Sequence, residues 1–378
     1  MDLVAGKTYP AERRPIRHLD PILLLAAAVL AVIGLFAIYS ATHQSLAAIG
    51  GDPGRFVKRQ LTFLAVGGVV VLLAASFDYR LVKVYAGLVY VSSLVLLVLV
   101  RTPLGTSVKG SQRWFELLGF QLAPSELAKL ALIAMLAAFL SEIRAELTLR
   151  DVFRAAGLAA VPGLLVFLQP DLGTSIVFAA ILVGILVVAG TRAKYLGVLA
   201  LTAVVLIFAG FQVGLVKEYQ VARLTSFLDP ANDPQRSGYN RTQAEIAIGS
   251  GGVFGLGYLQ GTQTNLDFVP EQHTDFIFTV IGEEFGFLGG AAMLGLYALL
   301  LWRAFRIALL SKDPFGTYLA AGVASMLALQ MFVNVGMTIG IMPITGIPLP
   351  FVSYGGSSLL TNCAAVGLLL NVHMRRFT

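Results

Sequence analysis

The sequence predicts an all-α integral membrane protein. Of its 378 residues, 57% are hydrophobic and only 13% are charged, whereas soluble domains average about 45–50% apolar and about 25% charged residues. The mean hydropathy is +0.80. Several uncharged runs reach the length of about 20 residues that crosses a hydrocarbon core, and the short alternating segments of barrel strands are not found. We therefore expect residues 1–378 to form a single polytopic membrane domain.

Apolar runs with charged edges predict about ten transmembrane helices. The first run, Pro21 to Ser40, is too long for the apolar part of a signal peptide, so we expect a retained helix after a tail of residues 1–19. Pro162 interrupts the fifth run, which a membrane bundle tolerates when neighbouring groups satisfy the freed backbone. The expected spans are 20–41, 60–77, 82–100, 124–141, 153–168, 172–190, 194–215, 275–302, 315–340 and 356–373.

The distribution of Lys and Arg predicts that both termini are cytoplasmic. With the N-terminal tail inside, the inner segments carry sixteen of these residues and the short outer loops carry six, as the positive-inside rule requires. Residues 216–274 then form a large extracytoplasmic loop between the seventh and eighth helices. The pI near 9.4 reflects these membrane loops, so anionic membrane lipids are better partners than nucleic acid.

Several kinds of site are excluded. The single Cys363 cannot form an intrachain disulfide, and the four histidines are scattered without metal-ligand spacing. The glycine-rich stretch GSGGVFGLG does not fit the dinucleotide-binding pattern, because Phe254 occupies its last glycine position. We expect no organic cofactor.

Glu126 and Lys129 form the first polar cluster in an apolar span. They are three residues apart and so lie on one helix face. Ionisable groups in membrane segments are costly and indicate function by default. One interpretation is a buried ion pair that orients the bundle. The other is that Lys129, together with Lys109 and Arg113 of the preceding outer loop, binds an anionic ligand.

Two further segments combine polar residues with helix breakers. In LQPDLGTS, residues 168–175, Asp171 precedes a helix start, where it can cap the helix or contact a substrate. In residues 334–358, Pro343, Pro348 and Pro350 forbid a continuous helix although the stretch is mostly apolar. We expect a re-entrant or interfacial loop there rather than a plain connector. The loop ends in a polar stretch that includes Ser353 and Tyr354.

The densest polar cluster is FVPEQHTDFIFTVIGEEFG, residues 268–286. Asp275 stands at the start of the eighth span, so it is either a helix cap or a reactive carboxylate. Glu271 and His273 lie beside it and can position or tune it, and we expect His273 also to bind the substrate. Glu283 and Glu284 follow about 12 Å deeper along a helix, where acids must be paired or face a polar cavity.

Together, GSGGVFGLG, FVPEQHTDFIF, GEEFG, QPDLGTS, PSELAKL and PLPFVSYGGSS resemble the SEDS family (shape, elongation, division and sporulation) of bacterial cell-wall proteins. The likeness spans roughly residues 20–375, and the motifs follow the family's order. Within the family, GTQTNLDFVPEQHTDF is more similar to the RodA (elongation) branch than to the FtsW (division) branch.

The resemblance implies ten transmembrane helices in the bacterial cytoplasmic membrane and a peptidoglycan glycosyltransferase that polymerises lipid II at the outer leaflet. It also implies a class B penicillin-binding protein as transpeptidase partner. Asp275 corresponds to the family's essential carboxylate, and Glu126, Lys129 and Asp171 correspond to other motif positions.

This reaction agrees with the residues themselves. Asp275 can be the general base that takes a proton from an acceptor sugar hydroxyl. Lys109, Arg113 and Lys129 can hold the departing diphosphate, alone or with a divalent cation such as Mg²⁺ or Mn²⁺. Two alternatives stay open, a lipid II flippase and a non-catalytic scaffold for a penicillin-binding protein.

Overall fold

The computed structural model describes residues 18–108, 111–117, 120–212, 214, 227 and 237–376. Lys109, one of the expected substrate-binding residues, lies outside the described residues. So does most of the segment from 215 to 236, which contains the first part of the expected large loop.

A helix occupies each of the ten expected spans. Eight of these helices are long and apolar enough to cross a membrane by length and composition, which confirms a helical membrane protein. The exceptions are α6, which has 17 residues, and α5, whose first turns carry Arg150, Asp151 and Arg154. The ten helices are α1 (Pro21–Ala48), α2 (Arg55–Ser76), α3 (Tyr79–Leu99), α4 (Pro124–Ser141), α5 (Leu149–Phe167), α6 (Leu172–Val188), α7 (Ala193–Gln212), α11 (Ile277–Leu309), α12 (Pro314–Thr338) and α13 (Gly356–Arg375). Pro162 lies within a continuous α5.

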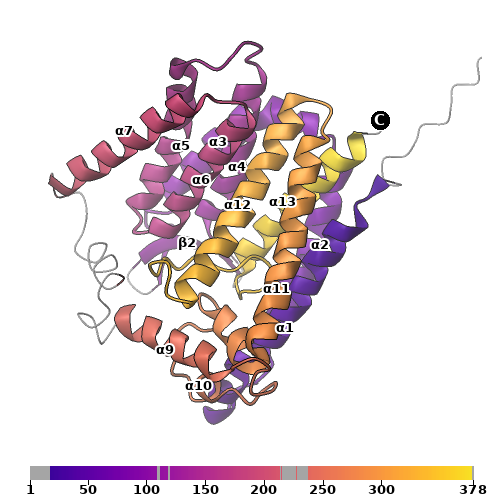
Figure 1. Ribbon diagram of the computed structural model, residues 1–378, viewed down its shortest axis with the longest axis vertical. Coiled ribbons are helices and arrows are strands. Elements are labelled where there is room, and N and C mark those ends of the chain that lie inside the picture. Colours follow the sequence, from indigo (N-terminus) through magenta and orange to yellow (C-terminus); the bar gives the residue numbers. More distant parts are fainter. Residues whose placement is uncertain are drawn as a thin grey trace, which may run out of the picture.

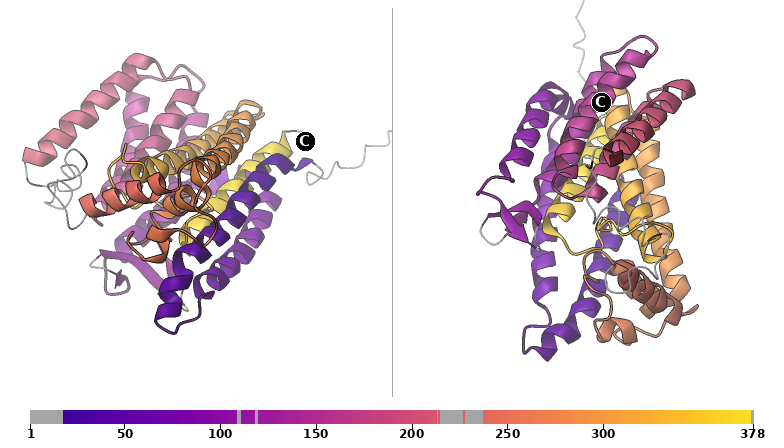
Figure 2. Two further views of the ribbon diagram at one scale, coloured as in Figure 1. Left: turned by 60° about the horizontal axis from the view of Figure 1, so that its bottom comes forward. Right: turned by 90° about the vertical axis from the view of Figure 1, so that its left-hand side faces the viewer.

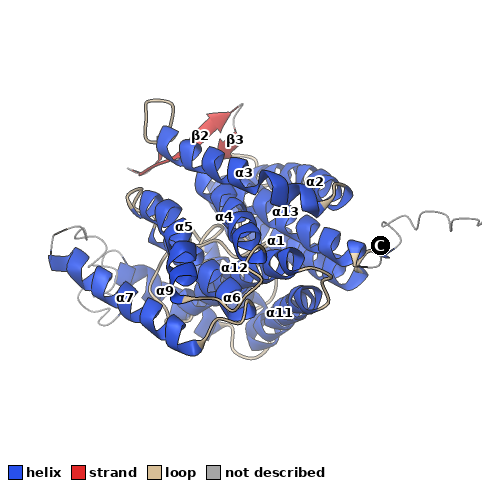
Figure 3. Ribbon diagram, turned by 90° about the horizontal axis from the view of Figure 1, so that it is seen from above, coloured by secondary structure: helices blue, strands red, loops and turns tan. Residues whose placement is uncertain are grey.

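The helices differ in how much of their surface the protein covers. In the most apolar 18 residues of α4, α12 and α13, 72% are buried, whereas none are buried in the corresponding part of α7. The first three form the interior of the bundle, and α7 lies at its edge (Figures 1 and 3). Lipid is therefore the natural solvent for α7.

The two ends of the bundle are built differently. The loop end holds three strands, the helices α9 (Ser237–Ser250) and α10 (Thr262–Asn265), and the loop 339–355. Figure 2 shows the sheet and α9 on different sides of this end. The terminal end holds the start of α1 and the end of α13, at the upper right of Figure 1. Asp20 caps α1 there, through a hydrogen bond from the Leu23 amide to Oδ1 (3.1 Å).

A small antiparallel sheet at the loop end was not among the expected elements. Its strands are β1 (Thr106–Val108), β2 (Ser111–Leu117) and β3 (Phe120–Leu122), in the order β1-β2-β3. Ser357 of α13 donates to the Gln121 carbonyl (2.5 Å) and accepts from the Ala123 amide (3.1 Å). Strands of three to seven residues are too short for a clear alternation of polar and apolar side chains.

The expected eighth span breaks at Gly286, which has φ 64° and ψ −161° inside α11. The glycine-rich stretch after α9 packs against this break. The Phe287 amide donates to the Gly252 carbonyl (2.9 Å), and the Leu256 amide donates to the Glu283 carbonyl (3.0 Å). A Cβ on Gly255 would lie 2.1 Å from the Glu284 carbonyl oxygen. Only glycine permits backbones to approach this closely.

Candidate active site

Asp275 lies in the turn before α11 and does not cap the helix. The N-cap is Phe276, and no side-chain hydrogen bond caps this end. Asn334 of α12, which is fully buried, donates from Nδ2 to both the Asp275 and the Ile347 carbonyls, each at 2.8 Å. A Cβ on Gly346 would lie 3.3 Å from the Asp275 carboxylate. Asn334 and Gly346 therefore place the half-buried carboxylate against the loop 339–355.

The loop 339–355 is non-helical and packed within the protein, as its prolines predict. Besides Asn334, three side chains hold its backbone. Gln60 of α2 donates to the Ser353 carbonyl (3.2 Å), Tyr297 of α11 donates to the Pro350 carbonyl (2.6 Å), and the Ser353 hydroxyl accepts from the Leu349 amide (2.9 Å). The loop's buried apolar side chains are Ile347, Leu349, Phe351 and Val352.

His273 and Tyr354 meet beside the start of α2. The Tyr354 amide donates to the His273 carbonyl (2.9 Å). The Phe56 ring lies 4.8 Å from the His273 ring and 5.0 Å from the Tyr354 ring, between centroids. Burial raises the pKa of Tyr354, while a hydrogen bond and positive charge from Arg59, and charge from Arg55, oppose the rise. Both arginines are exposed.

Sequence reasoning missed Arg55, Phe56 and Arg59 as site residues. It counted the two arginines only as outer-loop charges, because the second span was expected to begin at residue 60. The helix begins at Arg55 instead. Their spacing of four residues on a helix is the signal that could have found them.

Asp267 and Glu271 add negative charge near His273. Burial and then the Glu271 charge raise the pKa of Asp267, and His273 lowers it. Glu271 is exposed and has a positive φ of 54°. The segment 267–275 therefore gathers three acids and one histidine close to α11.

The two deeper acids hold the segment 259–265 against α11. Glu283 accepts hydrogen bonds from the amides of Gln263 (2.7 Å) and Thr264 (3.1 Å), and from the Thr264 hydroxyl (2.7 Å). Glu284 accepts from the Leu259 amide (3.1 Å) and from the hydroxyl of Ser40 in α1. Both acids are buried. Each therefore supplies acceptors for a buried backbone, as acids in a membrane protein must.

Gln272 joins the segments on either side of Asp275 and was not singled out from the sequence. Its Nε2 donates to the hydroxyls of Thr264 and Thr279, both at 3.0 Å, and the side chain is buried. Gln272 gives no distinctive sequence signal, because neither of the two threonines that it contacts is next to it in the chain.

Two of the cations expected to bind an anion, Lys129 and Arg113, have partners inside the protein. Lys129, which is 1% exposed, lies 2.8 Å from Glu126 Oε1. Arg113 donates to the Gln169 carbonyl (2.7 Å) and to the Pro170 carbonyl, and it lies 3.6 Å from the carboxylate of Asp171. The contacts of Arg113 link the sheet to the turn between α5 and α6.

Asp171 also caps α6, by accepting a hydrogen bond from the Thr174 amide (3.1 Å). Its carboxylate thus combines the capping interpretation with an ion pair to Arg113.

No group of three or more His, Cys, Asp or Glu side chains within the described ranges could hold a metal ion. Mg²⁺ commonly uses one or two carboxylates together with substrate phosphates.

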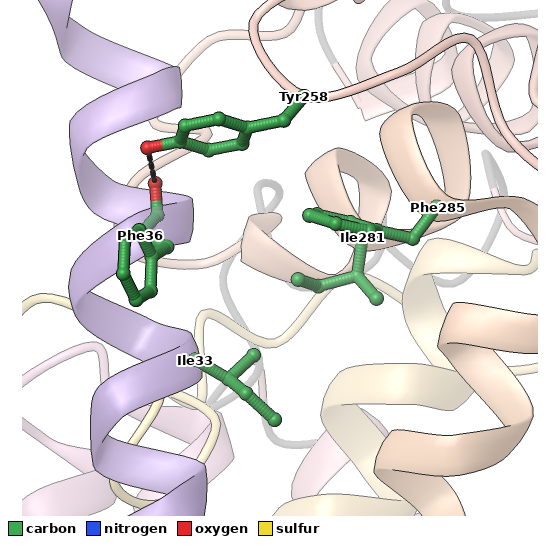
Figure 4. A pocket seen from close by; sticks show the side chains of 5 residues that line it. All are labelled: Ile33, Phe36, Tyr258, Ile281 and Phe285. Atoms are coloured by element: carbon green, nitrogen blue, oxygen red, sulfur yellow. Dashed lines mark hydrogen bonds between the residues drawn. The ribbon is translucent and has the colours of Figure 1, made fainter.

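An apolar pocket of about 360 Å³ lies between α1 and α11 (Figure 4). Its lining residues are Ile33, Phe36, Tyr258, Ile281 and Phe285. The Tyr258 hydroxyl donates to the Phe36 carbonyl (3.3 Å). Apart from the Tyr258 hydroxyl, the side chains that line the pocket are apolar.

The fold and the site define a polytopic membrane protein with a carboxylate site at one end of its bundle. The sequence profile described as "Cell cycle protein" (FTSW_RODA_SPOVE) matches residues 21–377. The chain is 40% identical over 358 residues to stage V sporulation protein E of Bacillus subtilis, covering 93% of this chain and 96% of that protein. It is 39% identical over 362 residues to peptidoglycan glycosyltransferase MrdB of Escherichia coli K12, covering 95% and 94%.

Solved structures agree. The chain matches a protein from a structure titled "Structural coordination of polymerization and crosslinking by a peptidoglycan synthase complex", with a TM-score of 0.80, 33% identity, and coverage of 95% of this chain and 99% of that one. It matches rod shape determining protein RodA of Thermus thermophilus with a TM-score of 0.70, 32% identity, and coverage of 95% and 98%. The chain belongs to the FtsW/RodA/SpoVE (SEDS) family, and it is a glycosyltransferase.

Proposed function

We propose that the protein polymerises lipid II into peptidoglycan glycan strands, with Asp275 as the general base. The observation that carries this assignment is the placement of Asp275. It is a half-buried carboxylate that caps no helix, set against Gly346 of a packed loop by the buried Asn334. Relatives named peptidoglycan glycosyltransferase support the substrate class.

In the proposed step, Asp275 accepts the proton of an acceptor sugar hydroxyl as that oxygen bonds to the anomeric carbon of the donor. The bond from that carbon to the lipid diphosphate breaks, and the diphosphate leaves with the electron pair. The developing negative charge on the diphosphate needs cations placed in advance.

Arg55 and Arg59 are suited to meet that charge. Both are exposed at the loop end, and both act electrostatically on Tyr354, which adjoins His273. We also propose that Lys109 contacts the departing diphosphate. We assign Arg113 and Lys129 a positioning role through Asp171 and Glu126, because these ion pairs lie inside the fold. A divalent cation carried on the diphosphate would supply further positive charge, and a chelator added during polymerisation tests that requirement.

The loop end faces outward in this proposal, with both termini in the cytoplasm, since the Lys and Arg bias favours that orientation. We also propose a role in cell elongation and a class B penicillin-binding protein as partner. The similarity to RodA and to a protein from a peptidoglycan synthase complex supports these assignments.

The test is lipid II polymerisation by purified Asp275→Asn protein. Loss of a general base lowers rates by about 10²–10⁴-fold, so we expect a fall of that size with no loss of folded protein. The matched control is Asp52→Asn, an exposed carboxylate at the same end that pairs with Lys58, for which we expect an unchanged rate. Near wild-type polymerisation by Asp275→Asn protein would falsify the assignment. If the wild-type protein moves lipid II from one leaflet of a vesicle membrane to the other without polymerising it, the flippase alternative is correct.

A further inference from the structure

Basic side chains of α11 and α13 gather around one buried acid, Asp20, at the terminal end. Asp20 is fully buried, and its Oδ2 accepts a hydrogen bond from Nε of Arg303 in α11 (2.9 Å). Nδ1 of His373 in α13 lies 4.0 Å from the same oxygen.

Two further arginines bring positive charge to this cluster. Arg306 lies one helical turn after Arg303 and is exposed. Arg376 follows α13. Burial, and then the like charges of Arg303 and Arg306, lower the pKa of Arg376, while Asp20 opposes this. In the part of the chain that the structure describes, three guanidinium groups thus act on one another around one carboxylate. A bound anion would relieve their repulsion.

An exposed tryptophan adjoins these arginines. Trp302 is 53% exposed, and its ring lies 5.4 Å from the guanidinium carbon of Arg303 and 5.5 Å from that of Arg306. Phe305, three residues after Trp302 on α11, is 41% exposed. Tryptophan side chains favour the headgroup level of a bilayer, and guanidinium groups stack on their faces. The cations therefore lie beside apolar surface that a lipid chain can cover.

We propose that Trp302, Arg306 and Arg376 form a binding site for the phosphate headgroup of an anionic phospholipid. The guanidinium group of an arginine binds phosphate oxygens through parallel N–H donors. Basic pockets between membrane helices are suited to anionic headgroups. A soluble phosphate shares this chemistry but makes no use of the apolar rings. The bound lipid bridges α11 and α13. The site is independent of the reaction at Asp275 and of the orientation of the bundle.

The experiment uses the full chain in phosphatidylcholine nanodiscs with and without a minor fraction of phosphatidylglycerol. The measurements are phosphatidylglycerol retained per protein, by native mass spectrometry, and the thermal unfolding midpoint. We expect wild type to retain phosphatidylglycerol and to unfold at a higher temperature in its presence. Each arginine near a headgroup contributes about fivefold in affinity, so Arg306→Gln with Arg376→Gln should reduce retention by roughly 30-fold.

Two controls keep the result interpretable. Arg80→Gln with Lys83→Gln removes the same charge at the start of α3 and should leave retention unchanged. Arg306→Gln alone alters an exposed side chain, so it should fold normally and reduce retention about fivefold. Equal retention by the two double variants would overturn the proposal. So would equal stabilisation of wild type by inorganic phosphate alone, because the ligand would then be a soluble anion.

Discussion

Glu283 and Glu284 at the loop end make different contacts from Asp20 at the terminal end. At the loop end, Glu283 and Glu284 accept hydrogen bonds from backbone amides and hydroxyls. At the terminal end, Asp20 pairs with a cation, Arg303, from a distant helix. Acids that bind backbone shape a loop, whereas an acid that binds a cation joins helices.

These two kinds of contact have different structural consequences. The loop end must hold irregular backbone around Asp275, and only hydrogen-bond acceptors placed at each amide can do so. The terminal end only has to keep α1, α11 and α13 together, for which one ion pair with good geometry suffices. Substitutions at the loop end should therefore affect activity most, and substitutions at the terminal end should affect stability most.

The largest effect on stability is expected for Arg303→Gln. It leaves the carboxylate of Asp20 buried without its strongest cation, and breaking a buried pair costs about 3–5 kcal/mol. Thermal unfolding of the purified protein measures the loss. Arg192→Gln, which breaks an exposed pair with Glu146, should change stability by less than about 1 kcal/mol. Equal effects of the two substitutions would mean that the ion pair of Asp20 does not join the helices.

Glu283→Gln should affect the loop end by a smaller amount. The new amide group faces an N–H donor of Gln263 or Thr264, and an unsatisfied buried donor costs about 1–3 kcal/mol. We expect faster hydrogen exchange in residues 259–265 and slower polymerisation. Glu245→Gln, at a partly exposed acid of α9 that pairs with Arg241, is the control. Unchanged exchange in 259–265 would contradict the role given to Glu283.

Gly346→Ala should reduce activity about tenfold or more, because a 1 Å misplacement of a reacting group can cost about 100-fold even when the mutation is distant. The substitution adds about 1–2 kcal/mol of left-handed strain and places a methyl group 3.3 Å from the Asp275 carboxylate.

Gly190→Ala is the matched control for Gly346→Ala. Gly190 has φ +77°, close to the +73° of Gly346, but nothing lies within 4 Å of an added Cβ. It should lose similar stability and keep its activity. If both variants lose activity equally, strain alone explains the effect and proximity to Asp275 does not.

The smallest effect is a pair of opposite pH dependences. The pKa of Asp267 is raised, chiefly by burial of its carboxyl, so its contribution to stability is present below its unfolded value of about 3.9. That contribution is lost as pH rises through the folded value. Asp267→Asn should therefore slightly increase stability at neutral pH relative to acidic pH, as unfolding measured across pH will show.

Asp52 provides the comparison of opposite sign. Its pKa is lowered, first by the hydrogen bond from Lys58, so its contribution is present above about 3.9 and is lost as pH falls. Asp52→Asn should slightly reduce stability at neutral pH relative to acidic pH. Slopes of the same sign for the two variants would contradict this account.

The sequence by itself indicated the membrane class, the approximate positions of the helices and a packed non-helical stretch within residues 334–358. Long apolar runs and prolines act locally, so their effect does not depend on distant residues. The motifs also indicated Asp275 as the residue to examine. Local patterns could not show that the second helix begins at Arg55 or that α11 breaks at Gly286.

The tertiary structure alone decided which groups meet. Asn334 reaches Asp275 across 59 positions, and Arg303 reaches Asp20 across 283. In the folded protein, Arg113 and Lys129 contact groups inside the bundle. Arg55 and Arg59 lie close enough to Tyr354 to act on it instead. A charge has no fixed partner until the helices pack, because only packing determines which opposite charge or carbonyl lies within hydrogen-bond distance.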